Sequence, residues 1–143
     1  MTRIKTTDLI FNLYTDGACR GNPGYGGAGV VLTDEEGNVV GDVRKFLGLC
    51  TNNLAEYRAL IIGLEEALRM HCRQLHIFLD SELLVNQING TYRVKNDKLK
   101  ILMKEVKRLL EFLDWYLVEH IGRDKNKMAD RLANQAIDEA CLE

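Results

Sequence analysis

One stretch near the N-terminus constrains the fold more than any other part of the chain. It runs from Leu9 to Leu32 and alternates apolar and polar side chains as far as Asp16. A dense cluster of Gly, Asn and Pro follows, and then a run of small apolar residues. The alternation predicts a strand with one buried face, and the cluster predicts a tight turn. We therefore expect a strand that ends on Asp16, an open turn and a second strand.

The composition indicates one domain with a substantial core. The chain has 143 residues, of which 46% are hydrophobic, so we expect a single domain over residues 1–143. The formal net charge of −2 argues against a generic polyanion binder. Contacts to nucleic acid would have to come from local basic surface and from metal ions.

Targeting and cysteine patterns favour a cytoplasmic protein. No apolar run is long enough to span a bilayer, and residues 1–7 lack the apolar core of a secretory signal. We expect no membrane association, and no protein partner is evident. The four cysteines show no CxxC spacing, so we expect free thiols and no zinc site. A bridge to Cys141 and the oligomeric state stay open.

The rest of the chain alternates between strand and helix patterns. After a hairpin turn at 34–38, hydrophobic periodicity predicts a strand over 39–48, a helix within 50–69 whose N-cap candidates are Thr51, Asn52 and Asn53, a strand over 75–80, helices over 82–89 and 97–113, a strand over 115–121 and a helix over 128–137. The order predicts an α/β fold with a five-stranded mixed sheet flanked by helices. Three strands are antiparallel and two are parallel, because a strand that follows a crossover helix pairs in parallel.

Four carboxylates stand at element ends in this arrangement. Asp16 and Asp80 end adjacent parallel strands, whereas Glu56 and Asp130 lie in the first turns of helices. Each has a structural explanation: aspartate before glycine ends strands, Asn53 and Glu56 form a capping box, and acids suit a helix N-terminus. Their joint placement predicts one cleft at the carboxyl edge of the sheet.

Such a cluster requires cations. Four carboxylates in one cleft would repel one another unless positive charge neutralised them. An oxygen-only set of ligands, without His or Cys, suits Mg²⁺ or Mn²⁺. Two such ions about 3.5–4 Å apart activate a water and stabilise the leaving oxygen of a phosphodiester.

The ordered motifs resemble those of type 1 ribonuclease H. They are Thr15-Asp16-Gly17-Ala18-Cys19 with Gly21-Asn22-Pro23-Gly24, Thr51-Asn52-Asn53 with Glu56, Asp80-Ser81, and Asn126 with Ala129-Asp130. The resemblance extends from about Phe11 to Ile137. It implies a ribonuclease H-like fold and endonucleolytic hydrolysis of the RNA strand of RNA/DNA hybrids, leaving 5′-phosphate and 3′-hydroxyl ends.

The resemblance also implies roles for individual residues. The metal-binding catalytic acids would be Asp16, Glu56, Asp80 and Asp130, with Mg²⁺ or Mn²⁺ as cofactor. The expected substrate contacts are Gly17, Asn22, Thr51, Asn52, Asn53, Ser81, Lys95 and Asn126. Short amides on turns can meet the 2′-hydroxyls that a hybrid displays in its minor groove.

The chain departs from the bacterial pattern at several positions. The loop before Asp130 has no histidine, and we expect Arg123, which lies in this loop, to contact the scissile or departing phosphate as a permanent cation. His120 lies upstream, within a predicted strand, and we expect it to be structural. The segment 90–97 is too short for the basic helical insertion. These features resemble the archaeal-like subgroup. Arg93, Lys95 and the basic face of the helix over 97–113 remain as phosphate contacts.

Two alternatives stay open. One is a nuclease of the same superfamily that acts on double-stranded RNA or on DNA. The other is a catalytically silent nucleic-acid-binding module. The asparagine-rich turns favour hybrid over DNA, and the retention of four acids argues against the silent module, because without metals they would only destabilise the fold.

Overall fold

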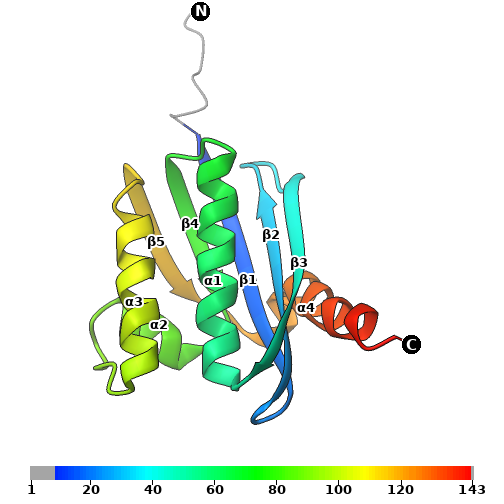
Figure 1. The fold of residues 1–143 in the computed structure, drawn as a ribbon. Coiled ribbons are helices and arrows are strands. Elements are labelled where there is room, and N and C mark those ends of the chain that lie inside the picture. Colours follow the sequence, from blue (N-terminus) through cyan, green and yellow to red (C-terminus); the bar gives the residue numbers. More distant parts are fainter. Residues whose placement is uncertain (1–8, 143) are drawn as a thin grey trace, which may run out of the picture.

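The computed structural model describes residues 9–142 and shows a five-stranded mixed sheet in the order β3-β2-β1-β4-β5 (Figure 1). The first three strands form an antiparallel meander, and the last two are parallel to β1. The predicted sheet is therefore confirmed. Its strands are β1 (Ile10–Gly21), β2 (Gly24–Thr33), β3 (Val39–Cys50), β4 (Gln74–Leu79) and β5 (Trp115–His120).

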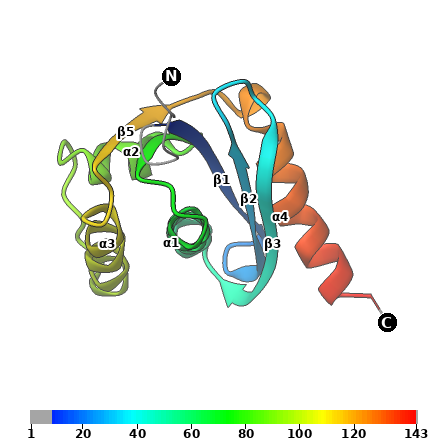
Figure 2. The same ribbon diagram turned by 90° about the horizontal axis from the view of Figure 1, so that it is seen from above.

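Helices cover both faces of the sheet. Viewed from above, α1 and α3 lie on one face and α4 lies on the other (Figure 2). The helices are α1 (Asn52–Arg69), α2 (Glu82–Ile88), α3 (Asp97–Leu110) and α4 (Lys127–Ala140), with a short 3₁₀ helix, η2 (Arg123–Lys125), before α4. The apolar faces of α1 and α3 pack on inward-facing sheet residues such as Leu13, Leu75 and Ile77, which are fully buried.

The first strand is longer than predicted. β1 does not end on Asp16 but continues to Gly21, because its pairing with β2 runs on to the turn, with Asp16 opposite Gly29. The parallel pairing of β1 with β4, in contrast, stops at Thr15 and Leu79. Asp16 is therefore the first residue beyond the parallel pair. Small residues after Asp16 hide the alternation from the sequence, since glycine and alanine show no apolar period.

Other bounds differ by a few residues. The helix predicted over 97–113 ends at Leu110, where the N–H groups of Phe112 and Leu113 bond to carbonyls three residues back and tighten the chain into a turn. β3 reaches Cys50, and α4 runs from Lys127 to Ala140. The prediction about residues 1–7 lies outside the described residues.

A glycine brings α4 onto the sheet. A Cβ on Gly29 of β2 would lie 1.9 Å from the carbonyl oxygen of Ala129, so a larger residue would push α4 away. Ala129 and Ala133 are buried on the facing side of α4. The backbone of the helix consequently rests on the backbone of the strand, and this contact carries the first turn of α4, with Asp130, to the site.

Within residues 9–142, no helix has the length and apolar character needed to cross a membrane. All four cysteines are free thiols there. Cys141 is exposed, whereas Cys50 and Cys72 are buried.

Candidate active site

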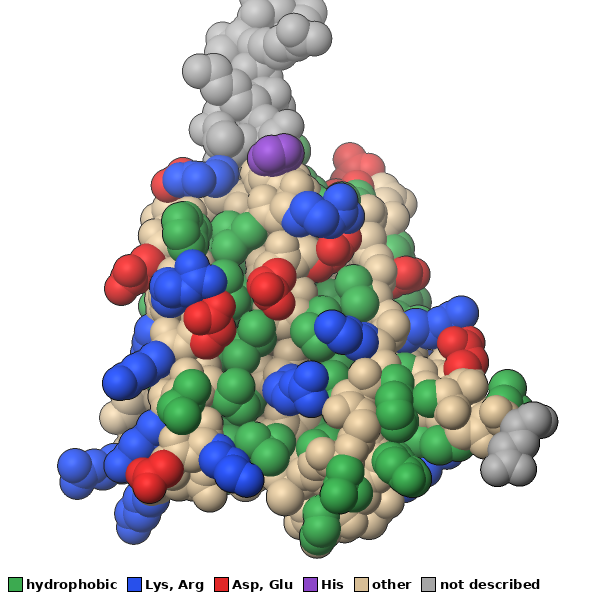
Figure 3. Space-filling view, in the orientation of Figure 1, with side chains coloured by type: hydrophobic (Ala, Val, Ile, Leu, Met, Phe, Trp, Pro, Cys, Tyr) green, Lys and Arg blue, Asp and Glu red, His purple; other side chains and the backbone are tan. Residues whose placement is uncertain are grey.

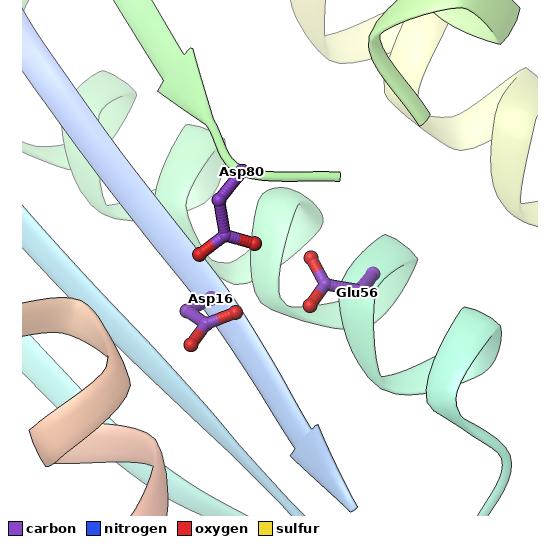
Figure 4. A group of neighbouring side chains, drawn as sticks. All are labelled: Asp16, Glu56 and Asp80. Carbon is purple, nitrogen blue, oxygen red and sulfur yellow. The ribbon is translucent and has the colours of Figure 1, made fainter. Parts of the chain in front are cut away.

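Three carboxylates from separate parts of the chain converge at the edge of the sheet. Asp16 comes from β1, Glu56 from α1, and Asp80 directly follows β4; their side chains point toward one another (Figure 4). One carboxylate oxygen from each lies within 4.8 Å of the others. We call these residues the acid trio. The structure thus brings together three of the four acids predicted from the sequence.

Gly17 permits the close approach of β1 and α1. A Cβ at this position would lie 2.3 Å from the carbonyl carbon of Ala55, so only glycine fits against the helix backbone. The Gly17 N–H also donates a hydrogen bond of 3.2 Å to Glu56 Oε1. The predicted substrate contact at Gly17 is untested, but the residue has a clear structural role in orienting Glu56.

The capping-box interpretation of Glu56 is wrong. The N-cap of α1 is Thr51, whose Oγ1 accepts a hydrogen bond of 3.3 Å from the Leu54 N–H. Glu56 lies beyond the first turn, which contains no acid, and its side chain turns to Gly17 instead. Freed from the cap, its carboxylate is available to the acid trio.

Asn126 lies within the protein behind Asp80. Its side-chain amide donates hydrogen bonds of 3.0 Å to Asp80 Oδ2 and of 3.0 Å to the Thr15 carbonyl. The residue is only 2% exposed. The side-chain NH₂ group of Asn126 is therefore used within the protein, by Asp80 and by the Thr15 carbonyl. The expected substrate contact at Asn126 is untested. His120 Nε2 lies 3.3 Å from the Asp80 carbonyl oxygen.

Burial controls the protonation of Asp16 and Glu56 in the absence of metal. It raises the pKa of Asp16, which is 6% exposed, well above that of an ordinary carboxyl, and the charges of Glu56 and Asp80 raise it further. Burial also raises the pKa of Glu56 to about 7, although a hydrogen bond with Asp16 opposes this. At neutral pH the pair therefore retains protons that a bound cation would displace.

The donor set fits a hard divalent cation. Among the described residues, three buried side-chain oxygens lack a hydrogen-bond partner: Thr15 Oγ1, Glu56 Oε2 and Asn126 Oδ1. All three belong to the acid trio or its immediate neighbours, and unpaired buried oxygens are unusual elsewhere in proteins. Asp16, Glu56 and Asp80 would hold Mg²⁺ or Mn²⁺ through carboxylate oxygens.

The acid trio opens into a cleft of about 640 Å³. Asp130 and Arg123 line the same cleft, although Asp130 is exposed and lies outside the acid trio. A hydrogen bond with Asp130 helps to raise the pKa of Asp16, so the fourth acid is within reach of the first. Asn134 in turn donates to the carbonyl and to Oδ1 of Asp130.

A second groove of about 730 Å³ adjoins this cleft. Asn52 and Asn53 line both, so the two hollows are continuous. Asn22 and Thr51 line the second groove, and Asn22 Oδ1 accepts a hydrogen bond of 3.1 Å from the Asn52 N–H. Ser81 lines the cleft with the acids. Lys95, by contrast, lines neither hollow and is exposed nearby.

Several lining residues were not predicted individually. Cys19, Glu82 and Leu83 line the cleft. Cys19 stood inside a quoted motif, and the other two follow Ser81 directly, so proximity to the motifs was the available signal. Asn96 and Lys98 at the start of α3 line the second groove. Only the tertiary contact of α3 with α1 brings them there.

Basic side chains gather where α3 begins. Figure 3 shows Lys and Arg clustered at the lower left of the molecule, at that end of α3. The exposed bases of this region are Arg93, Lys95, Lys98, Lys100 and Lys104. The chain therefore has a local positive surface beside the second groove, although its net charge is negative. Such a surface was expected if the chain binds nucleic acid.

Comparison with known proteins agrees with this geometry. The family model described as "Reverse transcriptase-like" matches residues 14–136. The bifunctional protein Rv2228c of Mycobacterium tuberculosis is 39% identical over 87% of this chain, which spans only 35% of that relative. Ribonuclease H of Coxiella burnetii is 38% identical, with 94% of each protein covered.

Solved structures give the same result. The crystal structure of LC11-RNase H1 in complex with RNA/DNA hybrid superposes with a TM-score of 0.88 at 41% identity, covering 92% of this chain and 99% of that one. The N-terminal RNase H domain of Rv2228c superposes with a TM-score of 0.89. With its acid trio, its sheet order and a short connection in place of a basic helical insertion, the chain belongs to the type 1 ribonuclease H family.

Proposed function

We propose that this chain cuts the RNA strand of RNA/DNA hybrids endonucleolytically with two divalent metal ions, leaving 5′-phosphate and 3′-hydroxyl ends. The observation that carries the proposal is the acid trio, whose oxygens lie within 4.8 Å of one another at the floor of a cleft. The complex of LC11-RNase H1 with RNA/DNA hybrid supports the choice of substrate.

The acids would hold the metal and the cleft would hold the scissile phosphate. Asp16, Glu56 and Asp80, together with Asp130 across the cleft, offer only oxygen ligands. Bound Mg²⁺ or Mn²⁺ would supply an activated water and neutralise charge at the phosphate. Arg123 lines the same cleft and would contact the phosphate directly as a permanent cation.

The asparagines would read the substrate. Asn52 and Asn53 stand where the cleft meets the second groove, and Asn22 is linked to Asn52. Their amides both donate and accept, which suits the 2′-hydroxyls that distinguish RNA from DNA. Gly17, Thr51 and Ser81 complete the proposed contact surface. Lys95 and its basic neighbours would attract phosphates of the hybrid from outside the groove.

The proposal includes a setting. We place the activity in the cytoplasm, in one domain over residues 1–143, with nucleic acid as the partner and no protein partner required. Double-stranded RNA is a second candidate substrate, since it also displays 2′-hydroxyls in its minor groove.

Cleavage of one labelled sequence in four forms tests the proposal. The forms are RNA/DNA hybrid, double-stranded RNA, single-stranded RNA and duplex DNA, each with Mg²⁺, Mn²⁺ or chelator. We expect metal-dependent cutting confined to the RNA strand of the hybrid, and 5′-phosphate on the products. Cutting of duplex DNA would favour the related nuclease. If no form were cut although hybrid bound, the silent binding module would replace the proposal.

A further inference from the structure

Asn126 holds two parts of the site at once. Its side-chain amide donates to Asp80 Oδ2 and to the Thr15 carbonyl, each at 3.0 Å. The backbone carbonyl of Asn126 accepts a hydrogen bond of 3.1 Å from the N–H of Asp130, which lies in the first turn of α4. One residue therefore links the carboxylate that follows β4, the end of the parallel pairing in β1, and the helix that carries the fourth acid.

The orientation of this amide follows from its surroundings. Both neighbours within hydrogen-bond distance are oxygens that accept, so the NH₂ group must face them. The opposite orientation would set Asn126 Oδ1 against a carbonyl and a carboxylate. The observed orientation is itself unfavourable in one respect, because it leaves Asn126 Oδ1 buried without a hydrogen-bond partner among the described residues.

A second cost appears at the start of α4. Thr51, Ser81 and Asn96 each cap their helix through a side-chain oxygen. Asn126 occupies the N-cap of α4 and makes no such bond. Asparagine is among the best capping residues, so its side chain forgoes a favourable local contact in order to reach Asp80. Broken local rules of this kind concentrate at functional sites.

We propose that Asn126 is a positioning residue: it fixes the orientation of the Asp80 carboxylate for metal binding, and does not itself contact the substrate. The inference rests on the proposed function for the metal but concerns a residue that acts only through Asp80. Partners that hydrogen-bond a metal ligand from behind commonly set its orientation and basicity.

Metal affinity of the whole chain, without substrate, tests the role. Titration calorimetry with Mn²⁺ and with Mg²⁺ should show affinity about 10- to 100-fold weaker in Asn126→Asp, which replaces the donor with a like charge, and an intermediate loss in Asn126→Ser. Asn12→Asp is the matched control, since the Asn12 amide also donates to a backbone carbonyl, that of Asp34, away from the acids. The control should bind metal like the wild type.

A double-mutant cycle separates positioning from general damage. In an Asp80→Asn background, Asn126→Ser should cause no further loss of metal affinity, because the carboxylate that Asn126 orients has already been removed. Equal losses in both backgrounds would overturn the inference, as would wild-type affinity in a folded Asn126→Ser protein. Far-UV circular dichroism without metal identifies which variants are folded, and the serine variant carries the test if the aspartate variant is not.

Kinetics gives an independent readout. On hybrid, Asn126→Ser should lower kcat at moderate Mg²⁺ with KM for the hybrid unchanged, and high Mg²⁺ should restore kcat. A merely structural defect would not respond to metal concentration. If the wild type itself cut no hybrid, the proposed function would fail, while the calorimetric cycle would still decide the role of Asn126.

Discussion

Two asparagines at equivalent places in their helices are used in opposite ways. Asn96 stands at the N-cap of α3, and its Oδ1 accepts a hydrogen bond of 3.1 Å from the Leu99 N–H. Asn126 stands at the N-cap of α4 and turns its side chain inward to Asp80. Asn96 lines the second groove at the surface, whereas Asn126 is buried. The same residue type serves local stability in one region and the acid trio in the other.

The comparison separates a region whose side chains stabilise the fold from a region whose side chains orient the acid trio. At α3, the N-cap side chain makes the local hydrogen bond typical of asparagine, and the start of the helix is exposed and basic. Around the acid trio, three buried oxygens are unpaired and two carboxyl groups have raised pKa values. We therefore expect a change of Asn126 to act on metal binding and cleavage, and loss of the Asn96 cap to act on stability.

The largest effect should come from the acid that Asn126 serves. Asp80→Asn should lower the rate of hybrid cleavage by about 10³-fold, equivalent to roughly 4 kcal/mol of barrier, because a charged metal ligand is lost. The protein should remain folded. Steady-state cleavage assays check this, with Asp114→Asn as the control, since Asp114 pairs with Arg73 away from the site. Comparable rates for both variants would contradict the assignment of the acid trio.

The pH dependence of stability should identify the same region. Burial raises the pKa of Glu56 from an ordinary 4.5 to about 7 and raises that of Asp16 further. At any pH between the ordinary pKa of these carboxyls and their raised pKa, the folded protein binds more protons than the unfolded chain. Its stability therefore falls as the pH rises through this range. Without metal, we expect the free energy of unfolding to drop by several kcal/mol from pH 5 to pH 8, at about 1.4 kcal/mol per pH unit for each carboxyl that is protonated only in the folded state.

Urea unfolding at each pH measures this slope. Saturating Mg²⁺ should flatten it, because the cation replaces the bound protons, and Glu56→Gln should also reduce it. A stability that rises across this interval in the metal-free protein would show that the acids are not buried as described.

Arg123 should have an intermediate effect. Arg123→Ala should reduce kcat about tenfold, or roughly 1.4 kcal/mol, because it removes a cation that lines the cleft and that we propose contacts the scissile phosphate. Arg123→Lys should retain part of the rate because it keeps the charge. Single-turnover cleavage separates the chemical step from product release. Wild-type rates in the alanine variant would remove Arg123 from the site.

The smallest effect should come from the capping asparagine. Asn96→Ala should cost about 1 kcal/mol of stability through loss of the α3 cap, which lowers the melting temperature by about 3 °C. Its metal affinity should match the wild type, in contrast to Asn126→Ser. Paired thermal melts with and without Mn²⁺ check both points. A loss of metal affinity in this variant would erase the distinction between the two asparagines.

Much of the fold could be predicted from periodicity. The helix predicted within 50–69 is confirmed because long apolar periods can be detected in a single sequence, and the crossover rule correctly predicted that β4 is parallel to β1. The end of β1 was wrong because glycine and alanine leave no pattern for a hairpin that extends past Asp16.

The site was predictable in membership but not in geometry. Motif order pointed to the acids, and Thr51 was one of three N-cap candidates, yet the sequence could not decide that Thr51 rather than Asn53 caps α1 and releases Glu56. Likewise, nothing local in the sequence indicates that the side chain of Asn126, at the N-cap of a helix, turns inward to Asp80. In both cases the choice between a local and a distant hydrogen-bond partner depends on packing.

The contact between Gly29 and Ala129 affects which parts of the protein can change over time. Where two backbones touch, their separation does not depend on side-chain volume, so core residues beneath α1 and α3 can be exchanged without moving α4. The position of Asp130 on α4 therefore does not depend on which side chains fill the core beneath α1 and α3. Within this family, we expect side chains of that core to vary more than the small residues at the two places where a helix backbone lies against a strand, the crossing of α4 with β2 and the contact of Gly17 with α1.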